Sequence, residues 1–270
     1  MEKKELRKIT RAELNVILDN HNLWLDTAEN EGERADLSYT DLQGFNLAGA
    51  NLHLANLRGA DLSGANLSCA NLVGTNLRGA DLTEANLQNA CLLWTDLVYT
   101  NLYLANLRGA DLTEANLQNA CLLWTDLVYT NLYLANLRGA DLTEANLQNA
   151  TLTDVKNFPD IPMACPTEGS FIGWKRAGDY IVKLEIPADA KRSSGTGIKC
   201  RCNKAKVLSI ETKGGTPADV TEVHSVFDSN FIYRVGETVT VNNFDDNRFN
   251  ECAPGIHFYM DRKRAVPVVI

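Results

Sequence analysis

Long hydrophobic runs are missing from this sequence: no apolar stretch approaches the roughly 18–20 residues that a membrane span needs. A disulfide framework is missing too, because the 7 cysteines are odd in number and show no regular spacing. The polar stretch that begins at Met1 lacks the apolar segment of a secretory signal. We therefore expect reduced thiols, no membrane contact and a cytoplasmic location, which would be the host cytoplasm or a virion if a phage or virus encodes the chain.

Signatures of catalysis are equally scarce. The sequence contains no serine nucleophile motif with histidine and aspartate partners, and no glycine-rich loop that would bind a phosphate. It offers no pair of carboxylates in a setting that predicts a concave, water-controlled site. We therefore assign no catalytic residue, no metal and no cofactor, and expect a protein that is not an enzyme.

Lysine is absent from residues 36–155, which contain 4 Arg but 12 Asp and Glu. This segment alone has a net charge of −8, the charge of the whole chain, so the two flanking segments nearly cancel. An acidic surface repels the phosphates of nucleic acids, whose binding depends on Lys and Arg. The charge distribution therefore argues against direct nucleic-acid binding and favours basic partners.

A five-residue repeat fills the middle of the chain. Leucine recurs at every fifth position from Leu37 to Leu152, which gives 24 consecutive units. Two residues before each leucine stands Ala or Thr, with Phe45 as the one large exception. Period five matches neither an α-helix nor a strand. A backbone that turns by a quarter circle in every unit would point both positions inward and leave the other three in solvent.

The pattern, A-(D/N)-L-x-x, resembles the pentapeptide-repeat family over nearly half of the chain. The resemblance implies a right-handed quadrilateral β-helix with four units per coil, and therefore about six coils. We expect a mainly β protein with three parts. Residues 1–34 would form an N-terminal helical cap, residues 35–155 the β-helix, and residues 156–270 a small C-terminal α+β domain.

Four units per coil would place every residue directly above the equivalent residue four units earlier. Asp41, Asp61 and Asp81 then form an acidic column, and Arg58 and Arg78 form a basic one on the adjacent face. Two interpretations are open. The columns are either a solvated surface with mutual salt bridges, each of which contributes little, or a surface for recognition.

A longer repeat lies over the first one, because residues 78–107 recur identically at 108–137 and in part at 138–150. Each copy is six units long, which is one and a half coils, so successive copies face opposite sides of the rod. Each copy carries outward apolar residues, which in the first copy are Leu93, Trp94, Val98, Tyr99, Tyr103 and Leu104.

On one face this offset brings residues from two copies together. Tyr103 is expected beside Leu123, and Leu104 beside Trp124. These side chains either cover the corners of the coil or form an interface, because a contiguous apolar patch with an exposed Trp is typical of interfaces. We take the four as candidate residues for binding a protein partner or for self-association.

The segment before the repeats predicts a helix, because Thr10 and Glu13 have the spacing of a capping box. Apolar residues with helical spacing follow at Leu14, Ile17 and Leu18. Residues 17–25 resemble the leader that precedes the repeats in many pentapeptide-repeat proteins of phage and bacterial genomes. An uncovered β-helix end exposes strand edges and core, so this helix is expected to cover the first coil. His21 would then pack beside Trp24 rather than bind a ligand.

A linker with prolines at residues 157–162 leads into a region of short apolar runs separated by turns. Strands are predicted near residues 171–175, 180–186, 205–211, 231–235 and 255–259, and a short helix at 261–266. The region resembles an uncharacterised C-terminal domain of phage-type pentapeptide-repeat proteins, through motifs at residues 190–194, 199–202 and 251–258. That resemblance implies no known activity.

Thiols and imidazoles of this region could in principle bind zinc. The candidates are Cys165, Cys200, Cys202, Cys252, His224 and His257. The C-x2–4-C spacing of zinc knuckles is absent, however. The Cys-x-Cys pair lies in or beside a predicted strand, and we expect its two side chains on opposite faces. We interpret the cysteines as buried structural residues.

Our main prediction is a non-enzymatic interaction or structural module, a rigid rod with acidic and aromatic walls and a C-terminal domain that caps the rod or recognises a partner. Two alternatives stay open. Some pentapeptide-repeat proteins mimic a DNA duplex and inhibit or protect DNA gyrase, and the acidic segment fits that role. Residues 255–258, followed by charged residues and Ala265, are similar to a strand and helix of ADP-ribosyltransferases, which would make His257 a site candidate of an enzyme.

Overall fold

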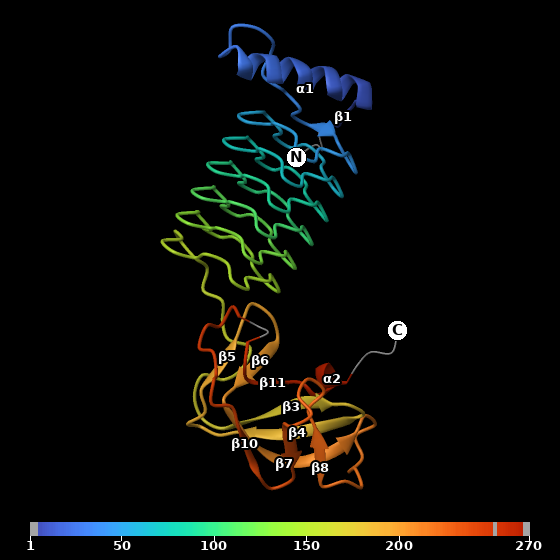
Figure 1. Ribbon diagram of the computed structural model, residues 1–270, viewed down its shortest axis with the longest axis vertical. Helices are drawn as coiled ribbons and strands as arrows, with labels where there is room; N and C mark the ends of the chain where they lie inside the picture. The colour runs from blue at the N-terminus through green and yellow to red at the C-terminus, as the bar shows by residue number, and fades with distance from the viewer. Residues whose placement is uncertain (1–4, 251–252, 267–270) are drawn as a thin grey trace. The chain divides into compact units, whose positions relative to one another are not determined.

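The computed structural model describes residues 5–250 and 253–266 and is mainly β (Figure 1). The chain divides into two compact units, Met1–Ile161 and Pro162–Ile270, and each is described by itself. Within the described ranges, no helix is long and apolar enough to cross a membrane.

The first unit begins with strand β1 (Arg7–Lys8) and helix α1 (Arg11–Asp26). The predicted capping box at the start of α1 is confirmed. The Thr10 hydroxyl accepts the Glu13 N–H at 3.2 Å, and the Glu13 carboxylate accepts the Thr10 N–H at 2.6 Å. This backbone hydrogen bond from Thr10 is the main reason why the pKa of Glu13 is lowered.

Strand β1 and helix α1 contact the first turns of the repeat, β1 through its backbone and α1 through side chains. Strand β1 pairs in parallel with strand β2 (Thr40–Asp41), and Arg11 donates to the carbonyl of Asn46 at 2.9 Å. His21 is fully buried, stacks on Trp24 and accepts the Ala35 N–H on Nδ1 at 3.2 Å. Burial lowers the pKa of His21 and favours the neutral ring, which is consistent with its predicted packing role.

The repeat stacks as predicted, with four units between residues that lie above one another. Parallel bridges join each Asp or Asn position to the equivalent position of the next coil, from Asp36↔Asn56 to Asn136↔Lys156. The central leucines from Leu37 to Leu137 also donate their N–H across this stack, as Leu97 does to the Asn116 carbonyl at 2.8 Å. The central leucines from Leu37 to Leu147 are at most 2% exposed, so the inward position is confirmed.

Threonines at the small inward position contribute a bond that the sequence pattern did not predict. Thr95 donates its hydroxyl to the Leu72 carbonyl at 2.8 Å, and Thr125 donates to the Leu102 carbonyl at 2.9 Å. Both threonines are fully buried. The hydroxyl is therefore satisfied by the preceding coil, which is how a polar side chain is tolerated in the core.

The Asp or Asn before each leucine is mostly half-buried, which corrects the prediction that this position simply faces solvent. Its Oδ1 accepts the N–H two residues later, as Asn101 does from Tyr103 at 3.2 Å. Where asparagines stack, Nδ2 donates to the Oδ1 of the preceding coil, as from Asn86 to Asn66 and from Asn106 to Asn86 at 3.3 Å. These side chains therefore both close the corners and join the coils.

Val98 and its copy Val128 are only 3% exposed, so the prediction that Val98 belongs to the exposed apolar surface of its copy is wrong. In the coils before and after, the same position holds the longer Arg78 and Gln118. The short Val98 side chain lies between these two and is covered by the stack. The exposure of an outward side chain therefore depends on the residues at the same position in the adjacent coils, and not on its own unit alone.

The fifth residue of each unit turns the chain with a positive φ, as at Gly59 and Gly64, both at +63°. A Cβ at Gly59 would lie 2.7 Å from Cε1 of Tyr39, whereas one at Gly64 would meet nothing within 4 Å. We expect Gly64→Ala to lower the free energy of unfolding by about 1–2 kcal/mol, because alanine is strained at this φ. Gly59→Ala should cost more, because the Tyr39 ring must shift as well. Urea unfolding compares the two, and equal losses would contradict this.

The second unit is built on a seven-stranded antiparallel sheet of order β10-β7-β4-β3-β11-β6-β5. Its strands are β3 (Phe171–Ala177), β4 (Tyr180–Ile186), β5 (Arg192–Ser194), β6 (Lys199–Cys202), β7 (Lys204–Thr212), β10 (Thr238–Thr240) and β11 (Ile256–Tyr259). Strands β8 (Glu222–His224) and β9 (Ile232–Arg234) form a separate hairpin. Helix α2 (Arg262–Ala265) follows β11, with Asp261 as its N-cap.

Strands β3, β4, β7, β9 and β11 and helix α2 confirm the elements predicted for this region, with small shifts at their ends. The short strands β5, β6, β8 and β10 were not among the predicted strands, because each is too brief to show an alternating pattern. The core lies on one face of the sheet, with Val182, Leu184 and Phe258 fully buried. Gly173 makes room for Phe258, since a Cβ there would lie 2.5 Å from its ring.

Candidate functional site

The candidate partner-binding residues lie together on one face of the repeat unit. Leu104 donates its N–H to the Leu123 carbonyl at 3.1 Å, which places the pairs 103–104 and 123–124 in adjacent coils. Tyr103, Leu104 and Trp124 are 39%, 43% and 53% exposed, and Leu123 is half-buried. We call these four residues the apolar wall.

Acidic residues border the apolar wall along its column. Glu84 donates its N–H to the Tyr103 carbonyl, which places it one coil before the wall. Trp124 donates to the Thr143 carbonyl, so Glu144 lies one coil after the wall. The face therefore presents an apolar centre between two carboxylates.

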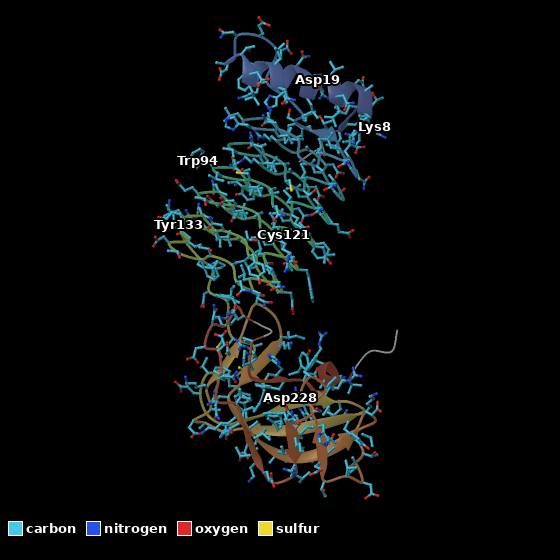
Figure 2. The ribbon with its side chains drawn as sticks, viewed as in Figure 1. Lys8, Asp19, Trp94, Cys121, Tyr133 and Asp228 are labelled. Atoms are coloured by element: carbon cyan, nitrogen blue, oxygen red, sulfur yellow. The ribbon has the colours of Figure 1, made fainter. Side chains whose placement is uncertain are left out.

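The equivalent residues of the other copies do not form a second wall. Trp94 is 60% exposed, but Gly74 and Glu114 occupy its position in the adjacent coils. Tyr133 lies on the same side of the repeat unit, one coil beyond Glu114 (Figure 2). At Trp124, by contrast, the offset between copies brings exposed large apolar side chains into neighbouring coils.

The exposed tyrosines of the remaining two faces each contact an arginine. Arg78 lies over the ring of Tyr99 with 5.6 Å to its centroid, and Arg108 lies over Tyr129 at 5.4 Å. Arg78 also approaches Asp96 at 3.8 Å. These cations lie against one side of each ring, although Tyr99 and Tyr129 remain 60% and 58% exposed.

The acidic column has the predicted register, with parallel bridges from Asp41 to Asp61 and from Asp61 to Asp81. Its carboxylates are partly engaged within the rod. Asp61 accepts the hydroxyl of Ser63 at 2.6 Å, and Asp81 accepts the hydroxyl of Thr83 at 2.6 Å. The next two positions are Asn101 and Cys121, so the uninterrupted run of charge ends after three coils.

The expectation that Cys200 and Cys202 point to opposite faces is wrong. Both side chains are fully buried in the core of the second unit, because alternate residues of a strand share a face. Arg201 between them points the other way. Cys165 joins the pair through a thiol hydrogen bond with Cys200, which lowers the pKa of Cys165 and raises that of Cys200. Burial raises the pKa of Cys202 to about 12.

The remaining candidates are dispersed. Cys252 lies outside the described residues. His224, on β8, shares a hydrogen bond with the Ser229 carbonyl at 2.6 Å. His257, on β11, lies opposite Arg201 in the strand register with β6. It also lines a cavity of about 710 Å³. Over the part of the chain that the structure covers, no three His, Cys, Asp or Glu side chains are arranged to hold a metal ion.

Comparison with known proteins supports this interpretation of the repeat. Segments 33–68, 60–97, 90–127 and 124–154 match the family of pentapeptide repeats (8 copies). The chain belongs to the pentapeptide-repeat family. Residues 161–265 match a family of unknown function (DUF5758). Among curated proteins no significant match is found.

Several solved pentapeptide-repeat structures are similar to this family member. HetL from Nostoc sp. strain PCC 7120, involved in heterocyst differentiation regulation, is 35% identical over 46% of this chain and 70% of its own, with a TM-score of 0.24. The protein alr5209 from Nostoc PCC 7120 is 32% identical over 47% and 89%, with a TM-score of 0.34. QnrB1, a plasmid-mediated fluoroquinolone resistance protein, is 19% identical over 47% and 70%, with a TM-score of 0.39.

Three residues of the second unit with unusual surroundings were missed by sequence reasoning. Lys175 and Tyr233 are 8% and 1% exposed and both line the 710 Å³ cavity, and Arg201 is 2% exposed. Lys175 lies two residues from both Gly173 and Ala177, so it shares the buried face of β3 with them. This spacing is the sequence signal that could have identified it. Nothing in the local sequence distinguishes Arg201 from the exposed arginines of the pentapeptide-repeat protein.

Proposed function

We propose that this pentapeptide-repeat protein is a non-enzymatic interaction module that binds a protein partner through the apolar wall. In this proposal residues 35–155 form a right-handed β-helix of about six coils, closed at its start by residues 1–34. Residues 156–270 form the C-terminal domain, which caps the rod or recognises a further partner. The observation that carries the proposal is the exposure of Tyr103, Leu104 and Trp124 in neighbouring coils.

The surroundings of the wall favour a partner over a second copy of the chain. Residues 36–155 have a net charge of −8 and no lysine, and Glu84 and Glu144 border the wall. Two such surfaces would repel each other on contact, whereas a partner with an apolar centre and a basic rim would be attracted. Trp and Tyr are the residues that most often dominate the energy of such contacts.

Trp124→Ala is expected to weaken partner binding by at least about tenfold and to leave the melting temperature nearly unchanged, because the side chain is exposed. Trp94→Ala is the matched control. It removes the equivalent residue of the preceding repeat copy, with 60% against 53% exposure, but on a face without a wall. Affinity purification with wild type and both variants, followed by titration of the purified partner, measures the effect.

The proposal requires that a partner be lost with Trp124→Ala and retained with Trp94→Ala. Equal recovery with both variants would refute binding through the wall. Light scattering of the purified protein tests self-association. A dimer that dissociates with Trp124→Ala but not with Trp94→Ala would show that the wall binds a second copy of the chain and not a different protein.

The acidic column supports the second candidate function, a DNA mimic that modulates gyrase. Asp41, Asp61 and Asp81 are stacked as that role requires, but the run spans three coils only. A gyrase supercoiling assay separates the two functions, since the mimic predicts inhibition that does not depend on Trp124. The ADP-ribosyltransferase alternative predicts NAD consumption that His257→Ala abolishes.

A further inference from the structure

The second unit contains a cavity of about 710 Å³, a volume typical of sites for small organic ligands. Strands β3, β6, β9 and β11 contribute Lys175, Lys199, Tyr233 and His257 to its lining. The turn between β8 and β9 contributes Ser225, Phe227, Asp228 and Phe231. The end of β10 with the residues after it (240–243) and the loop at 253–255 complete the lining. Figure 2 marks Asp228 on this unit.

Lys175 is a buried cation without a matching anion. Its side chain is about nine-tenths buried, since the residue is only 8% exposed. Nζ donates to the His257 carbonyl at a long 3.4 Å and lies 5.8 Å from the centre of the Tyr233 ring. Among the described residues, no carboxylate lies within ion-pair distance of it. A buried ammonium group in such surroundings is destabilised until an anion pairs with it.

The charges near Lys175 strengthen this imbalance. Burial, followed by repulsion from the Lys199 charge, lowers the pKa of Lys175 to about 8. Of the described residues that line the cavity, Asp228 alone carries a carboxylate. That carboxylate accepts the Asn230 N–H at 2.9 Å and forms no ion pair with either lysine. The cavity therefore has an excess of positive charge at its buried end.

The lining also contains a group of aromatic side chains, beside neutral polar residues such as Ser225, Thr240 and Asn242. Tyr233 and Phe231 are in edge-to-face contact, with 5.2 Å between their ring centres. Phe227 is 92% exposed on the turn that borders the cavity, which is unusual for so large an apolar side chain. A planar apolar body could rest on these rings while its charged group reaches Lys175.

We propose that this cavity binds a small organic anion, whose charged group pairs with Lys175 and whose planar apolar body contacts Phe231 and Tyr233. The site is separate from the apolar wall and does not depend on the function proposed for the repeat. It would give the domain of unknown function a ligand-binding role.

The test compares two fluorescent probes that share an apolar body. Anilinonaphthalene sulfonate carries a negative charge, and N-phenyl-1-naphthylamine does not. We expect the full-length protein to bind the sulfonate at least about tenfold more tightly, because a buried charged pair adds that much. Lys175→Met should remove this preference and leave the binding of the neutral probe unchanged. Lys183→Met, on the neighbouring strand β4, is the control and should retain the preference.

The pH dependence adds a readout that a merely structural lysine would not change. The sulfonate stays ionised, so its affinity should fall as Lys175 loses its proton between about pH 7 and about pH 9.5. Cys202 and Tyr233 stay neutral in this range because burial raises both pKa values. Lys199, Asp228 and His257 are the other titratable groups in the described lining of the cavity, and all three stay in place in Lys175→Met. Equal affinity of the two probes for wild type, or an unchanged preference in a folded Lys175→Met variant, would overturn the proposal.

Discussion

Leu97→Lys is expected to unfold several coils of the repeat unit and to lower its melting temperature by roughly 15 °C or more. Leu97 is 1% exposed in the middle of the stack. The change removes about 1.5–3 kcal/mol of apolar burial and places an unpaired ammonium group in the core. Because each coil contacts only its neighbours, a break in the middle also deprives the flanking coils of support.

Leu152→Lys is the matched control, because it alters the same repeat position in the last unit, where the leucine is only half-buried. Its lysine can reach solvent, so the loss should be a fraction of that at Leu97. Thermal unfolding followed by circular dichroism measures both. A melting temperature of Leu97→Lys within a few degrees of wild type would contradict the assigned position of this leucine.

Arg201→Met is expected to destabilise the second unit by about 3–5 kcal/mol, because three carbonyls lose a charged donor and each loss costs about 1–3 kcal/mol. The Arg201 guanidinium donates to the carbonyls of Asp245, Asn247 and Pro254 at 3.2, 2.8 and 3.4 Å. It also lies over the ring of Phe244. Removing it leaves these carbonyls without a charged donor and releases the loop that ends beside the cavity.

Hydrogen exchange of the full chain locates this effect. Strands β6 and β11 should lose protection in Arg201→Met, while the repeat unit keeps its own. Arg201→Lys should recover part of the loss, since one ammonium group cannot reach all three carbonyls. Arg176→Met, which alters an exposed arginine of β3 that bonds the Gly178 carbonyl, is the control. Unchanged protection of β6 in Arg201→Met would show that the loop is held by other contacts.

Much of the repeat unit follows from sequence because its information is local and repeated. Each unit has the same pattern, so the buried position of Leu97 predicts the buried position of Leu117 one coil later. It also predicts the backbone hydrogen bonds that join the two coils. The capping box of α1 was predictable for the same reason, since Thr10 and Glu13 lie within one helical turn and need no distant partner.

Exposure along the rod could not be predicted as well, because it depends on neighbours in the coils before and after. Val98 is buried between Arg78 and Gln118, while Trp94 remains exposed between Gly74 and Glu114. The asparagine ladders were missed for the same reason. Their polar side chains look solvent-facing within one unit and find partners only in the stacked structure.

In the second unit, which has no internal repeat, several features of the core and the cavity were not predicted from sequence. Cys200 and Cys202 were assigned to opposite faces against the two-residue period of a strand, and the sheet places both thiols in the core. Lys175 meets Tyr233 and His257 only because β3, β9 and β11 lie close together around the cavity. These residues are far apart in sequence, so no local pattern could have brought them into one site.

The sequence by itself determined the mainly β repeat, because its five-residue period recurs in every unit. The resemblance to the pentapeptide-repeat family added the stacking of four units to a coil, and with it the register that brings Leu104 beside Trp124. Only the tertiary structure decided which outward residues are exposed, how the asparagines join the coils and where Lys175 and Arg201 are buried. The physical reason is that burial and charge pairing depend on neighbours that are distant in sequence. The second unit has no repeat from which these neighbours could be predicted.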